Sequence, residues 1–75
     1  KVIEINPKHK WSYQNRGNAK SNLEDYQGAI EDFSKVIEID PNYKWAYQER
    51  GKAKNNLEDY QGAIEDFNKV IEIDP

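Results

Sequence analysis

The sequence LEDYQGAIEDF occupies residues 23–33 and recurs without change at residues 57–67. The similarity extends outward from this stretch, because residues 1–41 and residues 35–75 differ at only eight of 41 positions after a shift of 34 residues. A fixed period in this range is typical of proteins that stack one supersecondary unit on the next. The repeat therefore decides the fold, and it favours an extended binding surface over an enzymatic active site.

The apolar residues of the repeated stretch have the spacing of one helix face. They fall at offsets 0, 3, 4, 7, 10 and 11, and are Tyr26, Ala29, Ile30, Phe33, Val36 and Ile37. Asp25 precedes this helix as its expected N-cap, and Pro41 follows its end. The second copy predicts the same helix over residues 60–73.

The segment before each of these helices predicts another helix, with a thinner apolar stripe. In the first copy it is expected over residues 10–23, and its apolar side carries Tyr13, Ala19 and Leu23. A glycine inside a helix costs about 1 kcal/mol relative to alanine, yet Gly17 recurs as Gly51. We therefore expect the following helix to pass close to this glycine in both copies.

Each period is thus expected to form two antiparallel helices. Tight turns are expected at Glu24–Asp25 and Glu58–Asp59, and proline-containing links at residues 7–9 and 41–43. The expected fold is all-α and forms a single domain over residues 1–75. Its parts are the tail of a truncated helix with its link at 1–9, repeat 1 at 10–43 and repeat 2 at 44–75.

This pattern resembles the tetratricopeptide repeat family over essentially the whole chain. The period of 34 residues matches, as do Tyr13, Gly17, Ala19, Tyr26, Ala29, Phe33 and Pro41 and their copies Tyr47, Gly51, Ala53, Tyr60, Ala63, Phe67 and Pro75. The chain departs from the usual family residues at Arg16, Lys20, Glu24 and Val36, and at Arg50, Lys54, Glu58 and Val70. The resemblance implies a right-handed α-solenoid whose first helices line a concave, peptide-binding face.

The face of the first helices that lies away from the apolar stripe would line such a groove. We expect a bound segment to contact Trp11, Gln14, Asn18, Ser21 and Asn22 in repeat 1, and Trp45, Gln48, Lys52, Asn55 and Asn56 in repeat 2. Amides can pair with an extended backbone, and indoles supply apolar contact. The alternatives are that the amides are simply solvated, and that each tryptophan packs on a neighbouring link near His9 or Tyr43.

Charge divides between the two kinds of helix. Residues 10–23 contain three basic residues and no acid, whereas residues 24–40 contain six acids and one lysine. One interpretation is a mildly basic concave face, which would favour an acidic peptide. The alternative is that the opposite charges pair between adjacent helices.

Some members of the resembled family hold a peptide's terminal carboxylate with lysine, arginine and asparagine. Asn18 matches one of these positions, but Gln14 stands where the lysine would be and Glu49 where the second asparagine would be. We therefore expect no recognition of a terminal carboxylate of that kind.

The sequence gives little support to catalysis or metal binding. It has no cysteine, and His9 is its only histidine, so the common zinc ligand sets cannot form. No apolar run approaches the length of a membrane span, and a net charge of −3 disfavours nucleic acid. We expect a non-catalytic protein without a cofactor, and the sequence assigns no cellular location.

The second hypothesis is structural. The chain begins with lysine in the middle of the repeat and ends at Pro75, as an excised or designed piece would, and the near-identical copies fit recent duplication and design equally well. Helical arrays normally need polar capping helices at their ends. We therefore expect copies of the chain to dimerise or stack end to end through Val2, Ile3, Ile5, Phe67, Val70 and Ile71.

Overall fold

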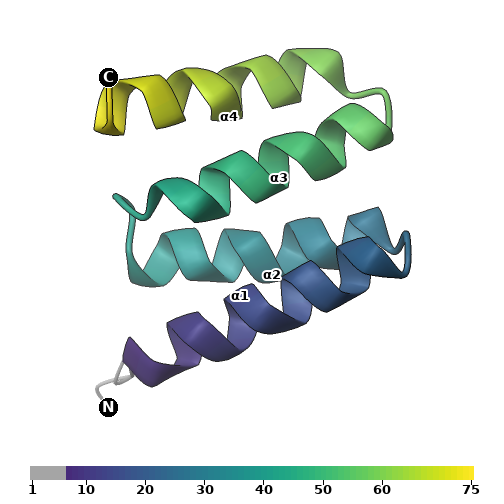
Figure 1. Ribbon diagram of the computed structural model, residues 1–75, viewed down its shortest axis with the longest axis vertical. Coiled ribbons are helices and arrows are strands. Elements are labelled where there is room, and N and C mark those ends of the chain that lie inside the picture. Colours follow the sequence, from purple (N-terminus) through teal and green to yellow (C-terminus); the bar gives the residue numbers. More distant parts are fainter. Residues whose placement is uncertain (1–6) are drawn as a thin grey trace.

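A computed structural model describes residues 7–75, with side chains from residue 9 onward. Its four helices are α1 (Pro7–Asn22), α2 (Tyr26–Ile39), α3 (Lys44–Asn56) and α4 (Tyr60–Ile73). Figure 1 shows successive helices running antiparallel and following one another along the stack. The two hairpins are α1–α2 and α3–α4, and α2 packs on α3 to join them. The prediction of an all-α array of helical hairpins is confirmed, while the stub expected at Val2–Ile5 lies outside the described residues.

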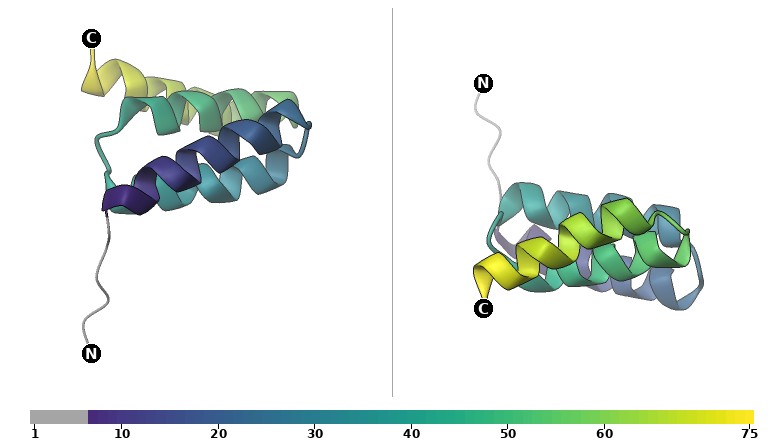
Figure 2. Two further views of the ribbon diagram at one scale, coloured as in Figure 1. Left: turned by 60° about the horizontal axis from the view of Figure 1, so that its bottom comes forward. Right: turned by 90° about the horizontal axis from the view of Figure 1, so that it is seen from above.

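The helices form two layers. In the left view of Figure 2, the first helices α1 and α3 lie in front, and the second helices α2 and α4 lie behind them. Contacts between α1 and α3 are sparse, whereas each hairpin is closely packed. The first helices are therefore free to border a groove on one face of the molecule.

The start of each second helix is capped as the sequence predicts. The Asp25 carboxylate accepts a hydrogen bond of 3.1 Å from the backbone N–H of Gly28, and Asp59 accepts one of 3.1 Å from Gly62. Such a cap contributes about 1 kcal/mol, because it satisfies a helix N–H that has no partner inside the helix. The cap fixes where α2 and α4 begin.

The turn inside each hairpin places a non-glycine residue in the left-handed region. Glu24 has a φ of 63° and Glu58 a φ of 65°. In the first turn the Asp25 N–H donates to the Lys20 carbonyl at 2.8 Å, and the Glu24 N–H donates to the Ser21 carbonyl at 2.9 Å. This pair of bonds is the Schellman ending of a helix, which glycine normally occupies. The predicted turns are confirmed.

The start of α1 differs from the prediction. Residues 7–9, expected as a link, form the first turn of the helix, which begins at Pro7. Proline is tolerated at this position because the first helical N–H groups have no intrahelical partner to lose. Proline therefore marks the beginning of α1 and does not separate it from a link.

The recurrent glycines allow the two helices of each hairpin to approach closely. A Cβ atom built on Gly17 would lie 2.6 Å from Cε1 of Phe33, and one built on Gly51 would lie 2.8 Å from Cε1 of Phe67. Both distances are shorter than van der Waals contact. The predicted close approach is confirmed, and a phenylalanine ring fills the space that each glycine leaves.

The apolar stripe of the first helices is more deeply buried in the second copy than in the first. Ala53 is buried, but its counterpart Ala19 is exposed, and Leu23 is 81% exposed against 46% for Leu57. The expectation that Ala19 and Leu23 pack in a core is therefore wrong. The reason is position, because α3 lies between α2 and α4, whereas among the described helices α1 packs closely only on α2.

Candidate binding pocket between α1 and α3

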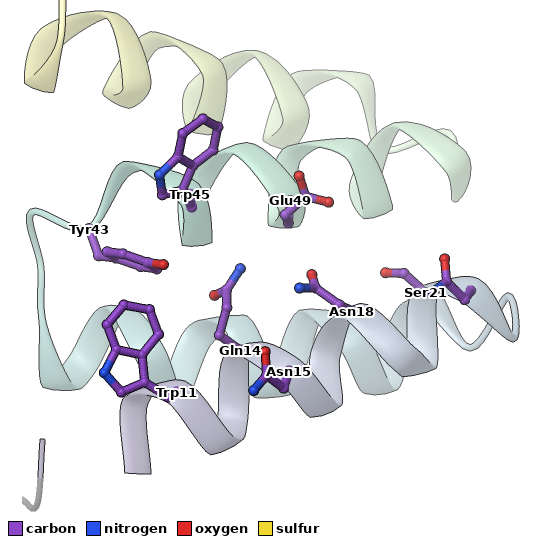
Figure 3. A pocket seen from close by; sticks show the side chains of 9 residues that line it. Trp11, Gln14, Asn15, Asn18, Ser21, Tyr43, Trp45 and Glu49 are labelled. Atoms are coloured by element: carbon purple, nitrogen blue, oxygen red, sulfur yellow. The ribbon is translucent and has the colours of Figure 1, made fainter. Parts of the chain in front are cut away.

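A pocket of about 480 Å³ opens between the two first helices. From α1 it is lined by Trp11, Gln14, Asn15, Asn18, Ser21 and Asn22. Tyr43, in the link before α3, and Trp45 and Glu49, on α3, complete the lining. Figure 3 shows Gln14 and Asn18 rising from α1 toward α3, with Tyr43 and Trp11 together at one end. The pocket thus joins two repeats.

The pocket gathers six of the ten residues expected to contact a ligand. These are all five from repeat 1, together with Trp45. The other four, which do not line the pocket, are Gln48, Lys52, Asn55 and Asn56. In α3 they stand at the positions that Gln14, Asn18, Ser21 and Asn22 occupy in α1. They therefore belong to the other side of α3, where the described chain has no further first helix.

Three lining residues are absent from the ten expected ligand contacts: Asn15, Tyr43 and Glu49. Of these, Glu49 was compared only with a carboxylate-binding position of the resembled family, and Tyr43 only with a packing partner of tryptophan. A groove between two parallel first helices is lined by different faces of the two helices. The 34-residue offset contained this signal, because Asn15 and Glu49 are copies of each other and both lie one position after the predicted glutamines. The wall that α3 contributes cannot be recognised from the sequence of a single helix.

Trp11 both packs on the link and lines the pocket. Its ring meets that of Tyr43 edge to face, with centroids 5.6 Å apart and planes at 87°. The ammonium of Lys10 lies 4.7 Å from each ring centroid and 3.1 Å from a carboxylate oxygen of Asp40. Trp11 nevertheless remains about half exposed. The packing alternative therefore holds for Trp11 without removing it from the pocket.

Trp45 is held less firmly. It is also about half exposed, and the ammonium of Lys44 lies 5.0 Å from its ring centroid. Lys44 in turn pairs with the carboxylate of Asp74 beyond the end of α4. One edge of the indole is thus available to the pocket, and a contact there would not disturb the Trp11–Tyr43 pair.

Gln14 is the most unusual residue of the pocket. Its side chain is only 5% exposed, although amides are ordinarily solvated. Within the described residues, its Oε1 atom has no hydrogen-bond partner. A buried acceptor without a donor costs about 1–3 kcal/mol, so Gln14 carries an unsatisfied acceptor in a side chain that lines the pocket.

Four basic residues of the first helices, Arg16, Lys20, Arg50 and Lys54, pair with acids inside their own hairpins. Nε and Nη2 of Arg16 each lie 2.8 Å from an oxygen of the buried Asp32, and Nζ of Lys20 lies 3.3 Å from it. The second hairpin repeats this arrangement around Asp66, with Arg50 and Lys54. The interpretation in which opposite charges pair between adjacent helices is therefore confirmed for these residues.

The pairing also shifts the acidity of the first hairpin. Hydrogen bonds from Arg16 lower the pKa of Asp32 below its ordinary value, although burial of the carboxylate opposes the change. Asp32 in turn raises the pKa of Arg16. Both groups stay charged at neutral pH, so the pair belongs to the hairpin and not to a proton-transfer site.

Two further findings concern the kinds of site the molecule can hold. In residues 7–75, no group of three or more histidine, cysteine, aspartate or glutamate side chains is arranged to bind a metal ion. None of the four helices combines the length and apolar composition needed to cross a bilayer.

The stacked hairpins and the groove between their first helices define a helical-repeat scaffold. Comparison with family models matches the tetratricopeptide repeat twice, over residues 11–43 and residues 46–75. The chain belongs to the tetratricopeptide repeat family, whose repeats generally serve as non-catalytic scaffolds for protein–protein interaction. A comparison with curated proteins found no match.

Proposed function

We propose that this chain is a non-catalytic module that binds an extended peptide or protein segment in the pocket between α1 and α3. The observation that carries the proposal is the side chain of Gln14, which lines the pocket and whose buried Oε1 has no donor among the described residues. A segment that supplies an N–H there removes the cost of the unsatisfied acceptor.

The size of the pocket suits a short extended segment. Along α1 the lining runs from Trp11 to Asn22, which at 1.5 Å per helical residue is a length of about 17 Å. An extended chain rises roughly 3.3 Å per residue, so about five residues of a ligand would lie along the pocket. Tryptophans such as Trp11 and Trp45 frequently dominate the binding energy of such contacts.

The test is capture of peptides from a random library by the immobilised chain, followed by affinity measurement with single variants. Trp45→Ala removes an indole that makes no aromatic pair within the described residues, so helicity should be retained while capture falls. Trp11→Ala should also weaken capture, but it removes the contact with Tyr43 as well. Capture that survives both substitutions would contradict the proposed site, and loss of helicity in Trp45→Ala would assign that indole to packing.

A second candidate function, self-association, is favoured by the outer face of α4. Tyr60, Ile64 and Ile71 are each more than half exposed, whereas their counterparts in α2 are half-buried against α3. Phe67 and Val70 are also less buried than their fully buried copies in α2. This face has nearly the same sequence as the surface with which α2 covers α3, so it suits a first helix of a second copy.

The interface between α2 and α3 indicates how two copies would join. There Nη1 of Arg50 donates to the hydroxyl of Ser34 at 3.1 Å. The corresponding residues at the two ends of the stack are Arg16 and Asn68, and an amide oxygen can replace the hydroxyl as acceptor. The other residues expected in this contact, Val2, Ile3 and Ile5, lie outside the described residues.

Sedimentation equilibrium over a range of concentrations tests this second function. Stacking predicts a mass that rises with concentration, and Ile71→Glu, on the exposed face of α4, should return it to that of the monomer. A mass that stays monomeric at millimolar concentration would exclude self-association. Peptide capture would be unaffected, because Ile71 lies outside the pocket.

A further inference from the structure

We propose that the pocket selects a segment bearing a lysine or arginine, with a backbone N–H of the segment donated to Oε1 of Gln14 and its cationic side chain placed beside the carboxylate of Glu49. This inference rests on the proposed function, since it names the chemistry of the segment that the same pocket would bind. It reverses the acidic preference that one interpretation of the division of charge along the sequence would favour.

The first step is the acceptor at Gln14, whose side chain would have to turn toward the segment, because its Oε1 is buried in the unbound chain. An acceptor oxygen in a pocket can be satisfied only by an N–H or O–H donor, and every peptide residue except proline carries a backbone N–H. An ionised carboxylate has acceptors alone, so an acidic side chain or terminal carboxylate placed there would leave Oε1 unsatisfied. Gln14 therefore favours a peptide backbone over an acidic group.

The second step is the charge that faces the ligand. Glu49 is the one charged side chain among the described residues that line the pocket. The four basic residues that could have balanced it are turned to Asp32 and Asp66 on the second helices: Arg16, Lys20, Arg50 and Lys54. The pocket thus presents an acid, while the neighbouring bases are held in the hairpins.

Two other basic residues near the pocket, Lys10 and Lys52, affect where a positively charged side chain of the ligand can bind. Lys10 is held by Asp40 at the Trp11 end, so a second cation there would be repelled. Lys52 lies 3.6 Å from a carboxylate oxygen of Glu49, but it is largely exposed, and exposed pairs of this kind are worth little. A ligand cation can therefore share or replace that contact at Glu49, and the net charge of −3 adds a weak general attraction.

The third step is a comparison of the two copies. They differ at only eight of 41 positions, and four of those pairs place at least one residue in the pocket lining: His9/Tyr43, Asn15/Glu49, Asn18/Lys52 and Ser21/Asn55. Half of the sequence differences between the two copies thus fall at positions that would contact a ligand in the pocket. Glu49 is one of these positions, and repeat 1 carries a neutral asparagine there.

This comparison also supplies a substitution that suits the fold. Glu49→Asn gives repeat 2 the residue that repeat 1 already has at the same place in the same helix. Gln14→Met removes the acceptor and keeps the length of the side chain, and Gln48→Met makes the same change at the equivalent position outside the pocket. Circular dichroism and thermal unfolding of each variant establish that the helices are retained.

The probes are three pools of N-acetylated, C-amidated heptapeptides, randomised except for a central lysine, acetyl-lysine or glutamate. Fluorescence anisotropy at low ionic strength should show the lysine pool binding about tenfold more tightly than the glutamate pool, with acetyl-lysine between them. Glu49→Asn should remove most of this difference. Gln14→Met should weaken the binding of all three pools to a similar extent. Gln48→Met should leave the binding of each pool unchanged.

The outcomes separate the inference from the proposed function. If none of the pools binds the unsubstituted chain, the proposed function fails and the inference fails with it. If the pools bind equally well, or if Glu49→Asn leaves the preference for lysine unchanged, the inference alone is overturned. Tighter binding of the glutamate pool would restore the acidic preference and overturn the inference in the same way.

Discussion

The guanidinium of Arg16 donates two parallel hydrogen bonds of 2.8 Å to the buried carboxylate of Asp32. This pair joins α1 to α2 across 16 residues of sequence and takes a positive charge away from the concave face. Bidentate pairs of this kind are stronger and more directional than single contacts. The same geometry recurs between Arg50 and Asp66, so each hairpin contains one bidentate ion pair between its two helices.

Asp32→Asn should destabilise the chain, because the substitution removes the charge and keeps the shape of the side chain. We expect a loss of about 1–3 kcal/mol in the free energy of unfolding at neutral pH, measured by urea denaturation. Arg16 is largely exposed and can be solvated, which keeps the loss below that of a fully buried pair. An unchanged free energy would show that the pair contributes nothing net.

The same pair predicts a dependence on pH. The pKa of Asp32 is lowered in the folded chain, mainly by the hydrogen bonds from Arg16, whereas an unfolded aspartate titrates near pH 3.9. The stabilisation from the lowered pKa is fully present above that value and is lost as the pH falls through the folded pKa. The difference in unfolding free energy between the wild type and Asp32→Asn should therefore be constant near neutrality and shrink in acid. A difference that is the same at pH 7 and pH 2.5 would assign the loss to packing.

The helices, and their boundaries except the start of α1, could be predicted because their causes are local. The spacing of apolar residues, the cap at Asp25 and the turn at Glu24 all act within a few residues of sequence. Charge pairing between adjacent helices, such as that of Arg16 with Asp32, was one of two interpretations of the charge pattern, since it depends on how the two helices of the hairpin pack. Glu49 was not among the expected ligand contacts, because its place in the second wall of the pocket depends on how one repeat lies against the next.

The turn residue Glu24 offers a route to greater stability. Its φ of 63° lies in the left-handed region, which costs a residue with a side chain about 1–2 kcal/mol and costs glycine almost nothing. Glu24→Gly should therefore raise the free energy of unfolding by about 0.5–1 kcal/mol, since the added freedom of glycine in the unfolded chain offsets part of the gain.

Thermal unfolding of matched variants checks this prediction. Glu58→Gly, at the equivalent turn with a φ of 65°, should give a similar gain, and the two gains should be nearly additive because the turns lie in different hairpins. Glu24→Ala serves as the control, because alanine loses the charge but keeps the Cβ atom. Equal midpoints for Glu24→Gly and Glu24→Ala would show that the charge, and not the backbone conformation, sets the cost.

The glycines opposite the phenylalanine rings allow two opposing effects to be compared in one chain. Replacing a helical glycine with alanine gains about 1 kcal/mol in helix propensity, whereas forcing a methyl group into a packed core costs about 1–3 kcal/mol. At Gly17 the new Cβ would lie 2.6 Å from a ring atom of Phe33, which is fully buried between its neighbours and cannot move aside. At Gly51 the corresponding distance is 2.8 Å, and Phe67 is less buried, so its ring can shift outward. Gly17→Ala should therefore lower the free energy of unfolding measured in urea, while Gly51→Ala should leave it nearly unchanged. A larger loss for Gly51→Ala would mean that the burial of the ring does not control the cost of overlap.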